Sequence, residues 1–197
     1  MHDDHPPGPG TAAPPVLVCL GDPAAAPATP AAFAAQRDGL DPDLRVETWA
    51  PPAAAGAAAA PDDAAFAEAV RTIGAGRPVH LLGFGAAAPA AVTLAARRPG
   101  LVRGLVLAGP HAAPSGTPLD GVTAPTLVIC GDDDRVAGEP VAQTYAGGVR
   151  DAVFVTVAGA GHRVHDERPD AFNAWVRSFA QIAEGLPHRA DTRRSAT

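Results

Sequence analysis

The sequence predicts an α/β protein with a doubly wound, mostly parallel sheet and helices on both faces. Short apolar runs recur along the chain, as they do in buried parallel strands, and amphipathic segments separate them. Connections through helices make a parallel sheet the simplest topology for such an alternation. We expect strands at about 16–20, 44–49, 79–83, 102–108, 125–130 and 153–157.

The segments between these runs carry helix boundary signals. Thr29 and Pro30 offer an N-cap and a first-turn proline, acidic residues open the second helix, and Pro99 stops the third. The Pro- and Ala-rich stretch 51–56 is interpreted as a loop. Helices are expected at about 29–37, 62–73, 87–98, 141–145 and 169–184.

Length and composition indicate one folded domain. The chain has 197 residues, of which 47% are hydrophobic and 18% charged, as in soluble globular proteins. Residues 1–14 are rich in Pro, Gly, His and Asp without periodicity, so we expect a disordered arm there. The folded domain is predicted to span 15–184, and 185–197 is expected to be a second disordered segment.

Several function classes are disfavoured by composition. The net charge is −6 and aromatics are only 5%, which argues against a nucleic-acid partner. No apolar run reaches the ~18 residues of a membrane span, and the N-terminus lacks a secretory signal pattern, so we expect a cytoplasmic protein. Basic residues are all Arg, and Ala, Gly and Pro abound, a bias typical of GC-rich bacterial genomes.

Cysteines and histidines give no sign of a metal or cofactor. Cys19 and Cys130 lie within predicted strands, which indicates buried, reduced thiols rather than nucleophiles. His2 and His5 have no third ligand at metal-binding spacing. We therefore expect no cofactor and no metal.

Ligands of open α/β sheets bind beyond the carboxyl ends of the strands. One of these loops carries the segment Gly83-Phe84-Gly85-Ala86-Ala87, between a predicted strand and a predicted helix. It resembles the nucleophile elbow of the α/β-hydrolases, whose pattern is small-x-nucleophile-x-small. The small residues at 83 and 87 suit a turn where strand and helix nearly collide. By this resemblance, Gly85 occupies the position of the nucleophile.

Two further segments resemble the other parts of that family's triad. The strand-and-turn segment 125–136 matches the one that delivers the acid, which would be Asp134, and 157–162 matches the loop of the catalytic histidine, which would be His162. The resemblance covers about residues 14–184. It implies a minimal α/β-hydrolase fold without a cap domain, because only about a dozen residues separate Ala108 from Pro125. The leading antiparallel hairpin of the family is also absent from the pattern.

The resemblance assigns further roles near the elbow. Backbone N–H groups of Ala86 and Asp22, beside Gly21, would form an oxyanion hole able to hold an enolate. The Asp22 carboxylate either turns to solvent or serves as a second acid/base group. Phe84 and His111 are expected to line the pocket, although a surface-loop position is equally compatible with His111.

A glycine cannot attack a carbonyl, so ordinary acyl-enzyme hydrolysis is not expected. Three functions remain open: a pseudo-hydrolase that binds a small molecule or a partner, a non-covalent His162/Asp134 acid–base enzyme of lyase, isomerase or dehydratase type, and a hydrolase in which His162 activates water. In the first, His162 is a remnant held by Asp134, or Asp134 merely caps a turn. The partner is expected to be a small-molecule ligand or a protein-borne substrate, and the oligomeric state and enzymatic status stay open.

Overall fold

The computed structural model describes residues 13–21, 30–50, 63–111, 116 and 118–188. Within them, six strands form one sheet in the order β2-β1-β3-β4-β5-β6, and every neighbouring pair is parallel. The predicted doubly wound sheet is confirmed, with no antiparallel strand in the described part of the chain. The strands are β1 (Val16–Leu20), β2 (Arg45–Trp49), β3 (Val79–Phe84), β4 (Val102–Ala108), β5 (Thr126–Gly131) and β6 (Ala152–Val157).

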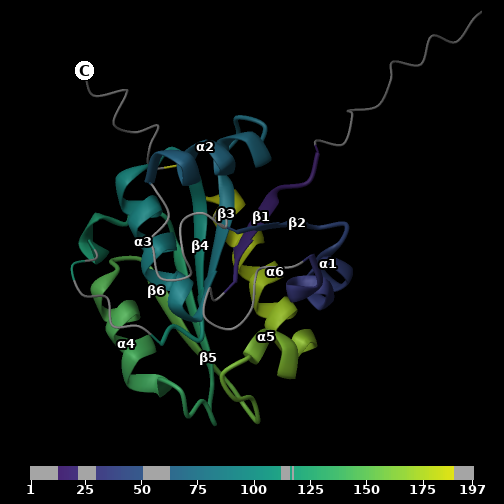
Figure 1. The fold of residues 1–197 in the computed structure, drawn as a ribbon, viewed down its shortest axis with the longest axis vertical. Coiled ribbons are helices and arrows are strands. Elements are labelled where there is room, and N and C mark those ends of the chain that lie inside the picture. Colours follow the sequence, from purple (N-terminus) through teal and green to yellow (C-terminus); the bar gives the residue numbers. More distant parts are fainter. Residues whose placement is uncertain (1–12, 22–29, 51–62, 112–115, 117, 189–197) are drawn as a thin grey trace, which may run out of the picture.

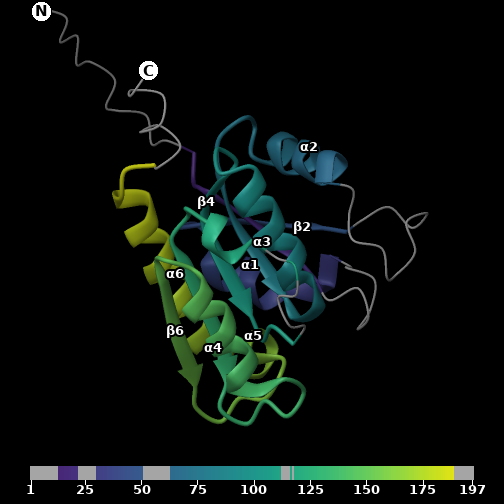
Figure 2. The same ribbon diagram turned by 90° about the vertical axis from the view of Figure 1, so that its left-hand side faces the viewer.

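Helices cover both faces of the sheet (Figure 1). One face carries α1 (Ala34–Leu40), α5 (Val164–Glu167) and α6 (Pro169–Gly185), and the other carries α2 (Asp63–Ile73), α3 (Ala88–Arg97) and α4 (Gly138–Gly148). The view turned by 90° shows β6 at one margin of the sheet (Figure 2). From β1 the chain adds β2 on one side of the sheet, and it then adds β3 to β6 in succession on the other side. The topological switch point of the sheet therefore lies between β1 and β3, next to the elbow.

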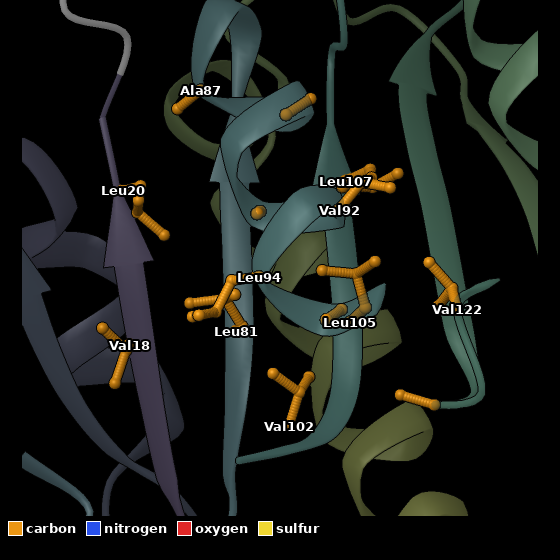
Figure 3. Close-up of a cluster of buried hydrophobic side chains, with 14 of the residues drawn as sticks. Val18, Leu20, Leu81, Ala87, Val92, Leu94, Val102, Leu105, Leu107 and Val122 are labelled. Carbon is orange, nitrogen blue, oxygen red and sulfur yellow. The ribbon is translucent and has the colours of Figure 1, made fainter. Parts of the chain in front are cut away.

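Each face has its own buried core. Leu81, Leu105 and Leu107 of the central strands pack with Val92 and Leu94 of α3 on one side (Figure 3). Alternate residues of the same strands pack under α1, α5 and α6 on the other side. The central strands are buried on both faces, which is why their sequences are continuous apolar runs rather than alternating ones.

Some element boundaries differ from expectation. The helix expected at 141–145 is α4, which spans 11 residues and buries Ala142 and Tyr145 of its central part completely. Pro140 lies in its first turn, where a proline is tolerated. The first helix begins with a 3₁₀ turn at Pro30–Phe33, whereas Thr29 and the loop 51–56 lie outside the described residues.

The terminal segments can be compared only in part. Helix α6 runs through Gly185, and Arg103 of β4 donates hydrogen bonds to the carbonyls of Glu184 and Leu186. The chain therefore remains attached to the sheet just beyond residue 184. Of the expected arm 1–14, residues 1–12 lie outside the described residues, and so do residues 189–197 of the expected segment 185–197.

The turn after β3 is as tight as its sequence predicts. A Cβ atom at Gly83 would lie 2.9 Å from the Ala91 Cβ atom, 3.0 Å from the Ala88 Cα atom and 3.1 Å from the Ala87 carbonyl oxygen. Real Cβ atoms keep larger separations from rigid neighbours, so position 83 accepts only glycine without a shift of α3.

We predict that Gly83→Ala lowers the free energy of unfolding by about 1–3 kcal/mol, because the added methyl group overpacks a rigid strand–helix contact. Gly100→Ala is the matched control, since no atom lies within 4 Å of a Cβ at that position. It should change stability by less than about 0.5 kcal/mol. Urea unfolding of both variants measures the difference, and equal stabilities would contradict the packing argument.

Candidate active site at the carboxyl edge of the sheet

Four neighbouring strands deliver the candidate residues to one edge of the sheet. Gly85 follows β3, His111 follows β4, Asp134 follows β5 and His162 follows β6. The strands are adjacent and parallel, with Phe84 paired to Ala108 and Gly131 paired to Val157. The loops after them therefore converge, as the rule for ligand sites in open sheets requires.

The elbow has the backbone geometry that its motif predicts. Gly85 has φ of 58°, and a 3₁₀ turn over Gly85–Ala87 leads directly into α3. Side chains are strained in this left-handed region, whereas glycine adopts it freely. Gly85 thus stands at the apex of the turn without a reactive atom. Its successor Ala86 is where the resemblance expects an oxyanion-hole N–H.

Asp134 and His162 form a hydrogen-bonded pair. The Asp134 Oδ2 atom lies 3.0 Å from the His162 Nδ1 atom, and the exposed fractions of the two side chains are 1% and 16%. The other carboxylate oxygen of Asp134 accepts hydrogen bonds from the backbone N–H groups of Val136 and Ala137. Burial alone would raise the pKa of Asp134, but these hydrogen bonds outweigh it and hold that pKa below its ordinary value.

Hydrogen bonds hold the loop that carries His162 both before and after this residue in the chain. The Gly159 N–H donates to Asp132 at 2.7 Å, and Arg168 donates to the Gly159 carbonyl at 3.1 Å. Glu167 accepts hydrogen bonds from the N–H groups of Gly161 and Arg163, at 2.8 and 3.0 Å. These contacts orient the imidazole before any ligand binds, which is a requirement for efficient general-base chemistry.

An aromatic wall supports the His162 ring. Phe84 is buried, and its ring centroid lies 5.1 Å from that of His162. Behind it, His165 contacts Phe84, Phe33 and Phe172 and is only 2% exposed. Burial lowers the pKa of His165 to about 4, and its Nδ1 atom has no hydrogen-bond partner. The structure thus places Phe84 under the catalytic candidate, as part of the wall that holds it.

His111 lies against His162. Its Nδ1 atom is 3.4 Å from the His162 Nε2 atom, and the two ring centroids are 5.2 Å apart. Within the described part of the chain, Asp134 and His111 are the hydrogen-bond partners of the His162 side chain. Neither supplies a hydroxyl or a thiol.

The predicted oxyanion hole can be followed only in part. Gly21 comes directly after β1, and Leu20 of that strand is paired with Gly83 of the elbow. Asp22 lies outside the described residues. Its role and that of Ala86 stay predictions.

Neither cysteine competes for the role of nucleophile. Burial raises the pKa of the Cys130 thiol to about 11, and the nearby Asp134 carboxylate adds to the shift. Burial also raises the pKa of Cys19. Both thiols are buried in strands, so they are protonated and unreactive near neutral pH.

Other binding features lie away from this edge or are not found. A cavity of about 240 Å³ opens near the amino ends of β1 and β2, where Pro15, Leu44 and Arg177 are among its lining residues. It therefore lies at the edge of the sheet opposite to the one that carries Asp134 and His162. Among the described residues, no three His, Cys, Asp or Glu side chains are arranged to hold a metal ion. None of the described helices has the length and hydropathy to cross a bilayer.

The site and the sheet together define a class: an α/β protein with an Asp–His pair beyond the carboxyl ends of its strands. No family model and no curated protein matches the sequence. Solved structures do match. NosK from Streptomyces actuosus shares 23% identity over 88% of this chain and 100% of its own, with a TM-score of 0.64. A putative lipase from Acinetobacter baumannii AYE shares 14% identity over 90% of this chain and 87% of its own, with a TM-score of 0.72.

A thermophilic esterase from Thermogutta terrifontis is similar as well, with 16% identity over 86% of this chain and 90% of its own and a TM-score of 0.67. The chain therefore has the α/β-hydrolase fold, as the elbow, acid and histidine motifs predicted. At these identities the similarity establishes the fold and leaves the activity to be argued from the site.

Sequence reasoning missed two kinds of residue at this edge. The sequence analysis gives no role to Glu167 or His165, yet Glu167 anchors the His162 loop and His165 packs against Phe84 on the side away from His162. The signal for Glu167 was present, because a Gly-rich loop exposes N–H groups that a nearby carboxylate can satisfy. No comparable signal existed for His165, whose burial depends on Phe33, a residue distant in sequence.

We predict that His165 makes the fold sensitive to mild acid. Because its pKa in the folded chain is about 4 and that of an unfolded histidine is about 6.5, the unfolded chain binds the proton first. Stability should be unaffected above about pH 6.5 and fall by on the order of 3 kcal/mol as the pH approaches 4. Urea unfolding at several pH values measures this loss for the native chain and for His165→Leu. Parallel curves for the two proteins would contradict it.

Proposed function

We propose that this protein is a general acid–base enzyme built on the α/β-hydrolase fold, with His162 as the proton-transferring group and Asp134 as its orienting partner. The observation that carries the proposal is the intact Asp134–His162 hydrogen bond of 3.0 Å beside an elbow whose apex is glycine. The reaction class is non-covalent at the elbow, of lyase, isomerase or dehydratase type.

The electrostatics of the pair support a working base. Asp134 is ionised near neutral pH because its pKa is lowered, so it accepts the Nδ1 proton of His162. That leaves the Nε2 lone pair to take a proton from a substrate, and the carboxylate stabilises the imidazolium that forms. A pair retained only as a remnant would not need Asp132, Glu167 and Arg168 to hold the loop in place.

Gly85 favours proton transfer over acyl transfer. A Ser–His–Asp relay needs a hydroxyl for the histidine to deprotonate, and Gly85 supplies none. The His162 imidazole would then exchange its contact with His111 for a substrate C–H or O–H group next to a carbonyl. Without a cap, the site suits a bulky or protein-borne substrate as well as a small molecule.

The proposal predicts that Gly85→Ser gains weak esterase activity on p-nitrophenyl acetate, on the order of tenfold or more above the native chain. The serine should cost about 1–3 kcal/mol of stability, because φ at position 85 is 58°. Since His111 lies close to the His162 Nε2 atom, the substitution is also made together with His111→Ala to leave the new hydroxyl unobstructed.

Asp134→Asn in the same background is the control, and it should abolish the gain by removing the orienting charge. Far-UV circular dichroism and urea unfolding establish that each variant is folded. If neither the single nor the double substitution gains activity in a folded protein, His162 is not a competent base, and the binding function is favoured instead.

A further inference from the structure

Strand β6 forms one margin of the sheet, and no other strand of the described residues lies beyond it (Figure 2). Its bonds to β5 determine which backbone groups face outwards. The carbonyls of Asp151 and Val157 accept hydrogen bonds from N–H groups of β5 and of the turn after it, so the odd-numbered residues face β5. Because the direction alternates along a strand, the N–H and C=O groups of Ala152, Phe154 and Thr156 point away from the sheet.

This edge has none of the features that usually prevent pairing with another strand. Exposed edge strands are typically protected by a charged side chain, a proline or a bulge. Strand β6 has the sequence Ala-Val-Phe-Val-Thr-Val, without a charge or a proline, and its register with β5 shows no bulge. Every residue after the first is β-branched or aromatic, the types that favour strands. The outward backbone groups are therefore open to a further strand.

Apolar side chains are exposed beside this edge. Val153 is 56% exposed, although Val155 and Val157 on the same side of β6 belong to the core beneath α6. On α6, Trp175 and Ile182 are 46% and 65% exposed. They lie on the flank of the helix opposite to the one that contacts α1, and α1 packs at β2, the other margin of the sheet. The side of α6 that faces the β6 margin therefore presents apolar surface to solvent.

The outward groups of β6 are complementary to those of an identical strand in antiparallel orientation. In a parallel pair, the residues that bond across are offset by one, which a two-fold axis between identical strands does not allow. In an antiparallel pair, two opposite residues exchange both of their hydrogen bonds. An axis at Phe154 pairs this residue with its own counterpart and pairs Ala152 with Thr156 of the second copy. Every outward backbone group of the strand then has a partner.

The charges beside the edge suit the same register. Glu139 of α4 is exposed and accepts a hydrogen bond from the Thr156 hydroxyl at 3.4 Å. Arg150 precedes Ala152 by two residues, is exposed and has no ion-pair partner within the described part of the chain. When Ala152 lies opposite Thr156 of a second copy, Arg150 comes to the end of the strand at which that copy carries Glu139. Two equivalent pairs of opposite charges then flank the paired strands.

We propose that this protein forms a two-fold symmetric dimer in which the β6 strands of two copies pair antiparallel and join the two sheets into one. The edge of a six-residue strand is small beside the roughly 1,200–2,000 Å² that stable interfaces bury, so the exposed apolar flank of α6 in each copy supplies further contact area. Because the paired strands run in opposite directions, the two Asp134–His162 pairs lie at opposite ends of the dimer, and neither site is covered by the second copy. The dimer is thus independent of the proposed function.

The test is sedimentation equilibrium of the full chain between about 1 and 200 μM. The native chain should approach twice its mass of 19.7 kDa as the concentration rises. Val153→Lys brings like charges together near the two-fold axis and should raise the dissociation constant by on the order of a hundredfold. Thr72→Lys is the matched control, because Thr72 is also β-branched and exposed but belongs to α2, which packs at β1. It should leave the dissociation constant unchanged.

Exchange of charges tests the register. Arg150→Glu and Glu139→Arg each place like charges at both ends of the paired strands, so each should raise the dissociation constant by about tenfold or more. An equimolar mixture of the two single variants should associate as tightly as the native chain, because each mixed dimer contains two pairs of opposite charges. All these substitutions are on the surface of the monomer, and far-UV circular dichroism establishes that each variant is folded.

A native chain that stays monomeric over the whole range overturns the dimer and leaves this edge to a strand of another protein. A dimer that Val153→Lys weakens no more than Thr72→Lys is joined through a different face, which also overturns the proposal. So does a mixture of folded Arg150→Glu and Glu139→Arg chains that associates no better than either variant alone. None of these measurements depends on activity, so they are distinct from the esterase test of Gly85→Ser.

Discussion

The carboxyl edge of this protein depends on one buried carboxylate and its imidazole partner. Asp134 is 1% exposed, and a charge so far from water is tolerated only when it is paired and hydrogen-bonded. Two backbone N–H groups and the His162 ring provide those partners. The pair therefore contributes to the fold, and the loops at this edge are constrained to keep His162 within reach of Asp134.

At the elbow, the backbone conformation is retained although the reactive side chain is missing. Strained backbone is normally kept at an active site because function requires a particular side chain there. Gly85 has the same left-handed φ without strain, so the chain keeps the turn at no conformational cost. The close approach of β3 and α3 at Gly83 is kept as well. The backbone framework of a nucleophile elbow is thus intact, although Gly85 brings no reactive side chain to its apex.

Local patterns predicted the framework because each element satisfies its own physical rule. Strands such as β4 are buried on both faces, so a continuous apolar run marks them in the sequence. Asp134 and His162 were identified because the segments that carry them resemble the acid and histidine loops of the α/β-hydrolases. The contact between His111 and His162 was not, because it joins loops 51 residues apart and depends on the close passage of Gly109. Burial of His165 under Phe33 is equally non-local.

At this site the side chain of the acid is more deeply buried than the imidazole that it contacts. Asp134 is almost fully buried, His162 is 16% exposed, and His111 is partly buried at the outer end. Coulombic attraction strengthens as water is excluded, so a positive charge on His162 would be best stabilised at its contact with the buried Asp134 carboxylate. Gly85 provides no side-chain atom for a covalent intermediate, so the retained Asp134–His162 contact is the feature of this edge from which any activity has to be argued.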